Sequence, residues 1–119
     1  ACAAALETIV LLEEELLANT ARVGEFLLER LGPLADVHPL VGDVRGRGLR
    51  LALELVKDRH TKEPATQERV KVIQLCYKKG LLLLPCGPSS IRFSPALVVR
   101  EEQALTAVQI LSDALGELE

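Results

Sequence analysis

The chain has 119 residues, of which 49% are apolar and 26% are charged, and its formal net charge at pH 7 is −3. This length suits one domain with a buried core, and the interspersed acids and bases give no basic face, which argues against nucleic acid as a partner. With two Phe, one Tyr and no Trp, the core must consist of aliphatic side chains, a composition that suits helices packed on a sheet.

The first predicted element is one long helix over residues 3–31. Its apolar residues recur close to the spacing of a helix face, and we expect a bend near Asn19 or Gly24. Gly32-Pro33 should end this helix, because glycine tolerates a left-handed cap and proline cannot continue the helical hydrogen bonding. A short edge strand is predicted at residues 35–38.

The pattern of residues 44–56 predicts a pair of strands or one bent strand. The segment VRGRGL brings two glycines into a tight turn, and every second residue after it is leucine. Such alternation is typical of a strand with one buried face and one polar or small face. Residues 57–64 follow as a charged loop.

The second half of the chain predicts a helix, two short strands and a final helix. Thr66 is the expected N-cap of the first helix and Gly80 its end. The apolar run 81–84 is typical of a strand covered on both faces. After a turn-rich loop, a short strand is expected at residues 91–93. The closing amphipathic helix, 101–118, carries two acids in its first turn, where the helix dipole favours them.

This order of elements predicts the fold class. We expect an α+β fold with a small, largely antiparallel sheet, helices packed on one side of it, and a long N-terminal helix before it. The sequence shows no repeat and no internal boundary, so residues 1–119 should form a single domain.

The three cysteines, Cys2, Cys76 and Cys86, are odd in number and widely spaced. They form no C-x-x-C pair and have no histidine cluster nearby, so neither a disulfide framework nor a metal site is expected. We expect all three cysteines to be reduced and structural. No basic leader precedes the apolar start, and no apolar run reaches the roughly 18 residues of a membrane helix. We therefore expect a cytoplasmic chain with no membrane partner. The mid-helix start without methionine predicts a processed or truncated product.

Arg92 is the residue of greatest chemical interest. It lies between two apolar runs, just ahead of Pro95. A guanidinium pairs bidentately with a carboxylate and keeps its charge at any working pH. The spacing alone also fits a surface arginine on an edge strand, so the role of Arg92 depends on its context.

Other candidate residues have plainer interpretations. Gly46 and Gly48 resemble the start of a phosphate loop, but Leu51 replaces the third glycine and a strand follows instead of a helix, so a turn or bulge is expected. His38 and His60 are interpreted as a strand-end residue and a loop residue. The acidic pairs of the helices, Glu13 with Glu14 and Glu101 with Glu102, are interpreted as solvated faces.

Three segments together carry a family resemblance. ACAAALETI at the start, VGDVRGRGLRLALELV in the middle and CGPSSIRFSPALVV near the end resemble, in order, the C-terminal small domain of class III (subgroup II) aminotransferases, with the 4-aminobutyrate aminotransferases most alike. The proline-rich run after Arg92 departs from the family pattern, because Ala96 replaces the second proline. The resemblance covers essentially the whole chain.

The resemblance implies a role for Arg92 as well as a cofactor. In the family, an arginine at this place binds the substrate carboxylate, or pairs with a glutamate and swings aside. The parent enzyme would move an amino group from an amino acid or ω-amino acid to a 2-oxo acid such as 2-oxoglutarate, with pyridoxal phosphate as cofactor, and would be a homodimer. The resemblance also implies that the cofactor groups lie on an absent large domain, as in the family. No lysine of this chain has an apolar context that would lower its pKa. This chain alone should therefore be inactive.

Two alternatives remain from the sequence. Members of the same fold family racemise or decarboxylate amino acids, and the groups that steer proton transfer are not expected in this chain. The other possibility is a free-standing α+β module that binds an anionic small molecule or a partner helix and performs no chemistry.

Overall fold

An antiparallel sheet organises the chain in the computed structural model, which describes residues 1–119. Its strands lie in the order β1-β2-β5-β4, and the two-residue β3 pairs with β2 off this path. The strands are β1 (Val41–Arg47), β2 (Arg50–Asp58), β3 (Glu63–Pro64), β4 (Leu84–Cys86) and β5 (Ser90–Phe93). All pairings are antiparallel. The predicted α+β class with an antiparallel sheet is confirmed.

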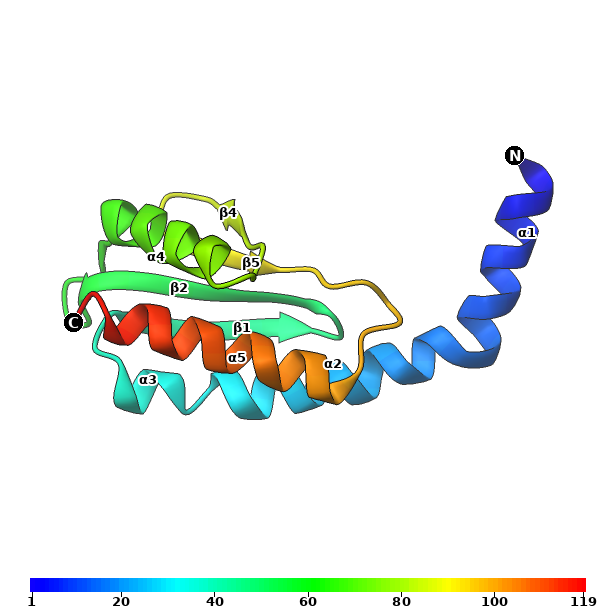
Figure 1. Ribbon diagram of the computed structural model, residues 1–119, viewed down its shortest axis with the longest axis horizontal. Coiled ribbons are helices and arrows are strands. Elements are labelled where there is room, and N and C mark those ends of the chain that lie inside the picture. The colour runs from blue at the N-terminus through cyan, green and yellow to red at the C-terminus, as the bar shows by residue number, and fades with distance from the viewer.

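The helices account for most of the remaining chain. They are α1 (Cys2–Leu11), the π-helical η1 (Leu12–Leu16), α2 (Leu17–Leu31), α3 (Leu34–Val37), α4 (Thr66–Lys78) and α5 (Glu101–Gly116). In Figure 1, α1 and η1 project away from the body of the molecule, while the helices that follow α2 lie beside the sheet. None of these helices combines the length and apolarity needed to cross a membrane.

The long N-terminal helix is bent, but not where the sequence predicted. The chain changes direction between α1 and α2, where η1 lies (Figure 1). Asn19 and Gly24, the predicted bend positions, both lie within the regular helix α2. A π-helical turn holds more residues than an α-helical turn, so it displaces the helix axis. The prediction relied on the low helix propensity of Asn19 and Gly24, and helix propensity did not indicate the change from α-helix to π-helix.

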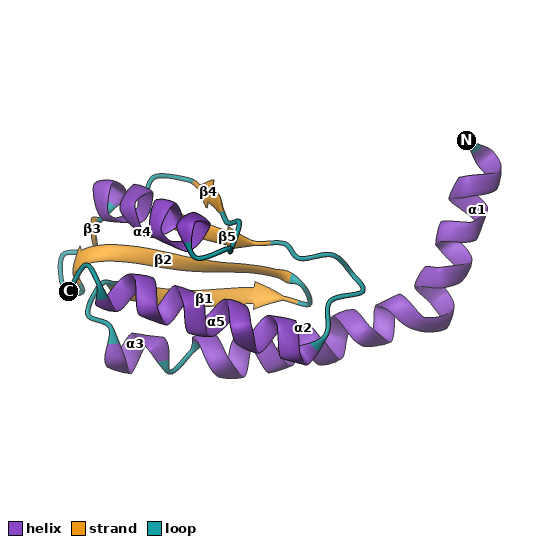
Figure 2. Cartoon of the chain, in the orientation of Figure 1, coloured by secondary structure: helices purple, strands orange, loops and turns teal.

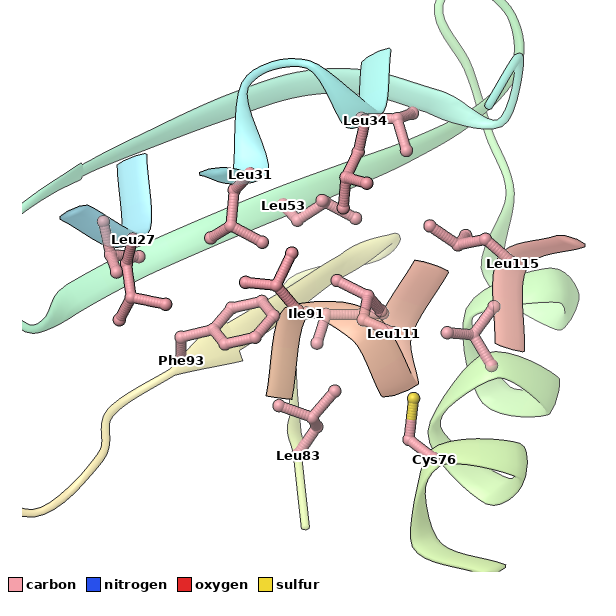
Figure 3. Packing of buried hydrophobic residues seen from close by; sticks show 14 of the residues in the cluster. Leu27, Leu31, Leu34, Leu53, Cys76, Leu83, Ile91, Phe93, Leu111 and Leu115 are labelled. Carbon is pink, nitrogen blue, oxygen red and sulfur yellow. The ribbon is translucent and has the colours of Figure 1, made fainter. Parts of the chain in front are cut away.

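One face of the sheet forms the core. The inward side chains of β2, Leu51, Leu53 and Leu55, are at most 2% exposed. Figure 2 shows α4 and α5 over the sheet, with α2 along β1. In Figure 3, side chains from α2, α4, α5 and the strands point toward one another, among them Leu27, Leu31, Leu53, Cys76, Ile91, Phe93 and Leu111. Burying a leucine contributes about 1.5–3 kcal/mol, so these contacts hold the helices on this face.

Two predicted details at the end of α2 are wrong. Gly32 stays right-handed, with φ −51°, and is no left-handed cap. Residues 35–38 form no edge strand, because α3 occupies Leu34–Val37. The fixed φ of Pro33, −61°, suits the start of a helix. The proline that ends α2 therefore also begins α3.

The apolar run at residues 81–84 is also different from its prediction. Only Leu84 belongs to a strand, and Leu82 and Leu84 are 74% and 55% exposed. β4 is an edge strand, so its outer side lacks a neighbour. Hydrophobicity cannot distinguish a covered strand from an exposed edge. The helix at residues 66–78 exists, but its N-cap is Ala65 and not Thr66, which is the first helical residue.

The predicted turn at VRGRGL is confirmed as the β1–β2 hairpin. Gly48 takes φ +56°, a left-handed conformation that glycine adopts without strain. A close contact fixes this turn to α2: a Cβ added at Gly24 would lie 2.7 Å from the Gly48 Cα and closer still to its carbonyl. The missing side chain of Gly24 therefore lets the helix backbone touch the hairpin backbone.

We predict that Gly24→Ala destabilises the fold. Glycine to alanine within a helix normally stabilises by about 0.5–1 kcal/mol. Here the new methyl group meets backbone that cannot move aside, so we expect the free energy of unfolding to fall by about 1–3 kcal/mol. Urea unfolding measures the change.

Gly116→Ala is the matched control. An added Cβ there meets only the His38 Cε1 at 3.9 Å, an ordinary contact. This variant should be unchanged or more stable by up to about 1 kcal/mol. Equal stability of Gly24→Ala and the unmodified chain would contradict the contact.

Candidate functional site

Arg92 lies in the middle of β5, on the face of the sheet opposite the core. Its strand neighbours Ile91 and Phe93 are buried, whereas Arg92 is exposed. Ala52 of β2 and Leu84 of β4 are its register partners. Side chains directly opposite in a sheet share one face and lie about 5 Å apart. The small side chain of Ala52 therefore leaves space beside the guanidinium.

The acidic groups of this open face are engaged elsewhere. Arg45 Nη1 donates to Asp43 Oδ2 at 2.7 Å and to Glu54 Oε2 at 2.8 Å. These hydrogen bonds, to Asp43 first and Glu54 second, raise the pKa of Arg45. Arg92 pairs with no carboxylate of this chain, and its side-chain contact is from Nη2 to the Cys86 Sγ at 3.4 Å. Its charge is therefore free to bind an external anion.

A cleft of about 330 Å³ lies beside Arg92 at the end of the sheet. Its walls are mostly apolar and come from the segments 81–84 and 92–95, from α5 and from Leu27 of α2. Ser94 and Gln103 supply polar groups. An apolar cleft with one cation at its edge suits a small molecule that carries a carboxylate on an apolar chain.

The residues present do not fit a pyridoxal-phosphate site. A Schiff-base lysine needs an environment that lowers its pKa. Every lysine of this chain is exposed: Lys57, Lys62, Lys71, Lys78 and Lys79. Lys57 and Lys79 have raised pKa values, because they donate to Glu63 and Glu117. No cofactor step is therefore assigned to this chain.

His38 was expected at a strand end, but the structure buries it. It follows α3 and is 5% exposed. Its Nε2 lies 2.9 Å from the Ser112 Oγ, and its Nδ1 lies 2.8 Å from Glu119 Oε2. The cluster connects α3 to the end of α5. No local sequence pattern indicates it, because His38 lies 74 and 81 positions before its two partners.

The remaining candidates have structural roles. His60 is exposed in the turn after β2, where its backbone N–H donates to Asp58 Oδ1 at 2.7 Å. Gly46 lies within β1 and pairs with Leu51, so VRGRGL does not form an anion cradle at a helix start. Glu13 and Glu14 are exposed on η1. The positions of His60, Glu13 and Glu14 agree with their sequence interpretation, whereas the turn or bulge expected at Gly46 is wrong, because Gly46 occupies a regular strand position.

The cysteines differ in environment. Cys76 is buried in the core, and burial raises the pKa of its thiol to about 11. Cys2 is exposed, and Cys86 is partly exposed beside Arg92. The neighbourhood of Cys86 and Arg92 follows from the β4–β5 register, in which Cys86 pairs with Ser90.

Comparisons with known proteins agree on one family. The family model described as "Aminotransferase class-III" matches residues 1–115. The taurine–pyruvate aminotransferase of Rhodobacter capsulatus is 41% identical over 98% of this chain and 27% of its own length. The leucine/methionine racemase of Thermococcus litoralis is 36% identical (98% and 26%), and the 4-aminobutyrate aminotransferase of Escherichia coli strain K12 is 34% identical (98% and 28%). The chain spans about a quarter of the length of these relatives.

The structures agree as well. An amine transaminase from an uncultivated Pseudomonas species, solved in its PLP-bound form, superposes with a TM-score of 0.91 at 37% identity. The match covers 99% of this chain and 27% of that one.

We predict unequal alkylation of the three thiols at pH 8. A thiol with a pKa of about 11 is thiolate in only about one molecule in a thousand at this pH, and only the thiolate reacts. Cys2 should react with iodoacetamide first, Cys86 second and Cys76 last, as peptide mapping would show. Urea-unfolded chain is the control, in which all three should react alike. Rapid labelling of Cys76 in the folded chain would contradict the buried site.

Proposed function

Because the chain belongs to the class III aminotransferase family, we propose that residues 1–119 form the C-terminal small domain of a pyridoxal-phosphate-dependent aminotransferase. The proposed enzyme moves an amino group from an amino acid or ω-amino acid to a 2-oxo acid. The fraction of the relatives' length that the chain spans, 26–28%, supports a domain role. The parent enzyme is proposed to be a cytoplasmic homodimer.

The observation that carries this proposal is the free guanidinium of Arg92. It stands on the open face of the sheet, beside a small residue and an apolar cleft, and pairs with no carboxylate of the chain. Arg92 is proposed to bind the substrate carboxylate through paired N–H donors. The cleft would receive the carbon chain and exclude water from it.

The cofactor chemistry is proposed to lie on another part of the enzyme. Pyridoxal phosphate, when bound, stabilises negative charge at the substrate carbon that carries the amino group. The residues of this chain hold the carboxylate end, and so fix the distance and orientation of the amino group. In the alternative in which Arg92 pairs with a glutamate, that glutamate is not one of this chain's neighbours on the sheet, since Arg45 holds Glu54.

The amino donor is proposed to be 4-aminobutyrate or a related ω-amino acid. The names of relatives support this only in part, because they include taurine–pyruvate and 4-aminobutyrate aminotransferases. Racemisation is the second candidate, because a leucine/methionine racemase and an isoleucine 2-epimerase match over 98% of the chain. Loss of the α-deuterium of labelled L-leucine without transfer of nitrogen to 2-oxoglutarate would identify racemisation.

We predict that Arg92→Leu in the full-length enzyme raises the KM for 4-aminobutyrate. The lost charge-assisted hydrogen bonds are worth about 1.5–3 kcal/mol each, so an increase of about 10-fold to 100-fold is expected. The KM of Arg92→Lys should lie between those of the unmodified enzyme and Arg92→Leu, since lysine keeps the charge but not the planar pair of donors. Steady-state kinetics measures both variants.

Arg50→Leu is the matched control for this change. Arg50 is also exposed on a strand of this sheet. Its removal should leave the KM within about twofold, because it does not line the cleft. An unchanged KM for Arg92→Leu would reject carboxylate binding by this residue.

We also predict that the chain alone forms no specific imine with pyridoxal phosphate. Its exposed, protonated lysines should react weakly and without preference. Borohydride reduction followed by intact mass and peptide mapping tests this, with the full-length enzyme as the positive control. Stoichiometric labelling of one lysine in the chain would overturn the domain proposal.

A further inference from the structure

Asn19 is the only asparagine of the sequence, and it lies within helix α2. Asparagine is unfavourable inside a helix, because its amide competes with the backbone for hydrogen bonds. Here the amide bonds to a distant segment instead. Its Nδ2 donates to the Leu97 carbonyl at 2.7 Å and to the Val99 carbonyl at 3.1 Å. Both contacts join residues about eighty positions apart in the chain.

The segment that Asn19 holds, residues 94–99, has no helix or strand of its own. Its one backbone–backbone hydrogen bond is internal, from the Val99 N–H to the Ala96 carbonyl at 2.9 Å. The two bonds from Asn19 are therefore the hydrogen bonds that join the segment to another element. Without these two hydrogen bonds, only packing contacts would hold the backbone of residues 94–99 in place.

This segment directly follows the strand that carries Arg92. On one side of β5 the pairing ends at Leu84 with Arg92, and on the other at Leu51 with Phe93. Beyond Phe93 the chain leaves the sheet, and three residues of the segment, Ser94, Pro95 and Val99, line the cleft beside Arg92. The position of the segment thus sets the shape of the cleft wall.

The orientation of the Asn19 amide is itself fixed. Arg22 Nη2 donates to the Asn19 Oδ1 at 2.8 Å, one helical turn away. This bond assigns the oxygen to Arg22 and turns the Nδ2 donors toward the two carbonyls. A carboxylate in the same place would accept from Arg22 but would repel both carbonyl oxygens.

We propose that Asn19 is a positioning residue for substrate recognition. It clamps residues 94–99 to α2 and so fixes the position of the cleft wall relative to Arg92. This inference rests on the proposed role of Arg92 in carboxylate binding. Asn19 touches neither substrate nor cofactor, and acts through the segment.

The first test is a double-mutant cycle in the full-length enzyme. Asn19→Asp changes the amide to a carboxylate of the same size. Each hydrogen bond is worth about 1 kcal/mol, so we expect the KM for 4-aminobutyrate, and for L-alanine as a second donor, to rise about tenfold, with kcat within twofold. In an Arg92→Leu background the same change should have less than a twofold effect, because the binding partner is already lost.

Gln109→Glu is the matched control. It makes the same amide-to-carboxylate change at an exposed position of α5 that makes no side-chain hydrogen bond. Its KM should be unchanged. Equal effects of Asn19→Asp with and without Arg92, or a loss in kcat alone, would overturn the positioning role.

The second test measures the order of the clamped segment and needs no activity. The Val99 N–H donates to the Ala96 carbonyl within that segment, so its hydrogen exchange should be about tenfold faster in Asn19→Asp than in Gln109→Glu. Arg22→Leu, which keeps Asn19 but removes its orienting bond, should give a smaller effect of about threefold and keeps the test valid if Asn19→Asp folds poorly. Unchanged exchange in both variants would reject the clamp. If exchange is faster in Asn19→Asp but the KM of Arg92→Leu equals that of the unmodified enzyme, the clamp is supported and the proposed function is rejected.

Discussion

The alternation of side chains along β2 from Leu51 to Leu55 is the constraint on which the rest of the structure depends. Leu51, Leu53 and Leu55 face the helices, so Ala52 and Glu54 must face the other way. Residues paired across two strands point to the same face, so the pairing of β2 with β5 sets the side-chain directions of β5. Ile91 and Phe93 therefore enter the core, and Arg92 lies on the open face. A slip of one residue would reverse every side chain and place a guanidinium in the core. The apolar face therefore fixes where the cation lies.

The charged side chains on the open face differ in whether they have an ion-pair partner within the chain. Arg45 pairs with both Asp43 and Glu54, so one guanidinium holds two carboxylates and the group keeps a net charge of −1. Such exposed pairs contribute little stability, about 0–1 kcal/mol each. Their larger effect is to leave Arg92 without an internal partner, across the small side chain of Ala52. The sheet thus separates an ion cluster held by Arg45 from Arg92, which has no carboxylate partner within the chain.

Helix α2 connects the hairpin, the core and the segment after Arg92. Gly24 brings the helix backbone against the turn at Gly48, and Leu27 and Leu31 enter the core. Five residues before Gly24, Asn19 donates to the carbonyls of residues 97 and 99. A single helix therefore contacts both the hairpin and the segment after β5, which lie at the same end of the sheet because Leu51 pairs with Phe93. Helix α1 makes no such contacts and has no buried residue.

The sequence by itself determined the long helices, their order and the hairpin at VRGRGL, because periodicity and glycine act locally, and it singled out Arg92 as a candidate for carboxylate binding. It did not reveal the exposed edge at Leu82 and Leu84, the buried His38 with Ser112 and Glu119, or the contacts of Asn19 and Cys86. Each of these depends on a partner that lies far away in the chain or on the lack of a neighbouring strand. Tertiary structure decided them because pairing register and helix packing bring together residues that no local pattern connects.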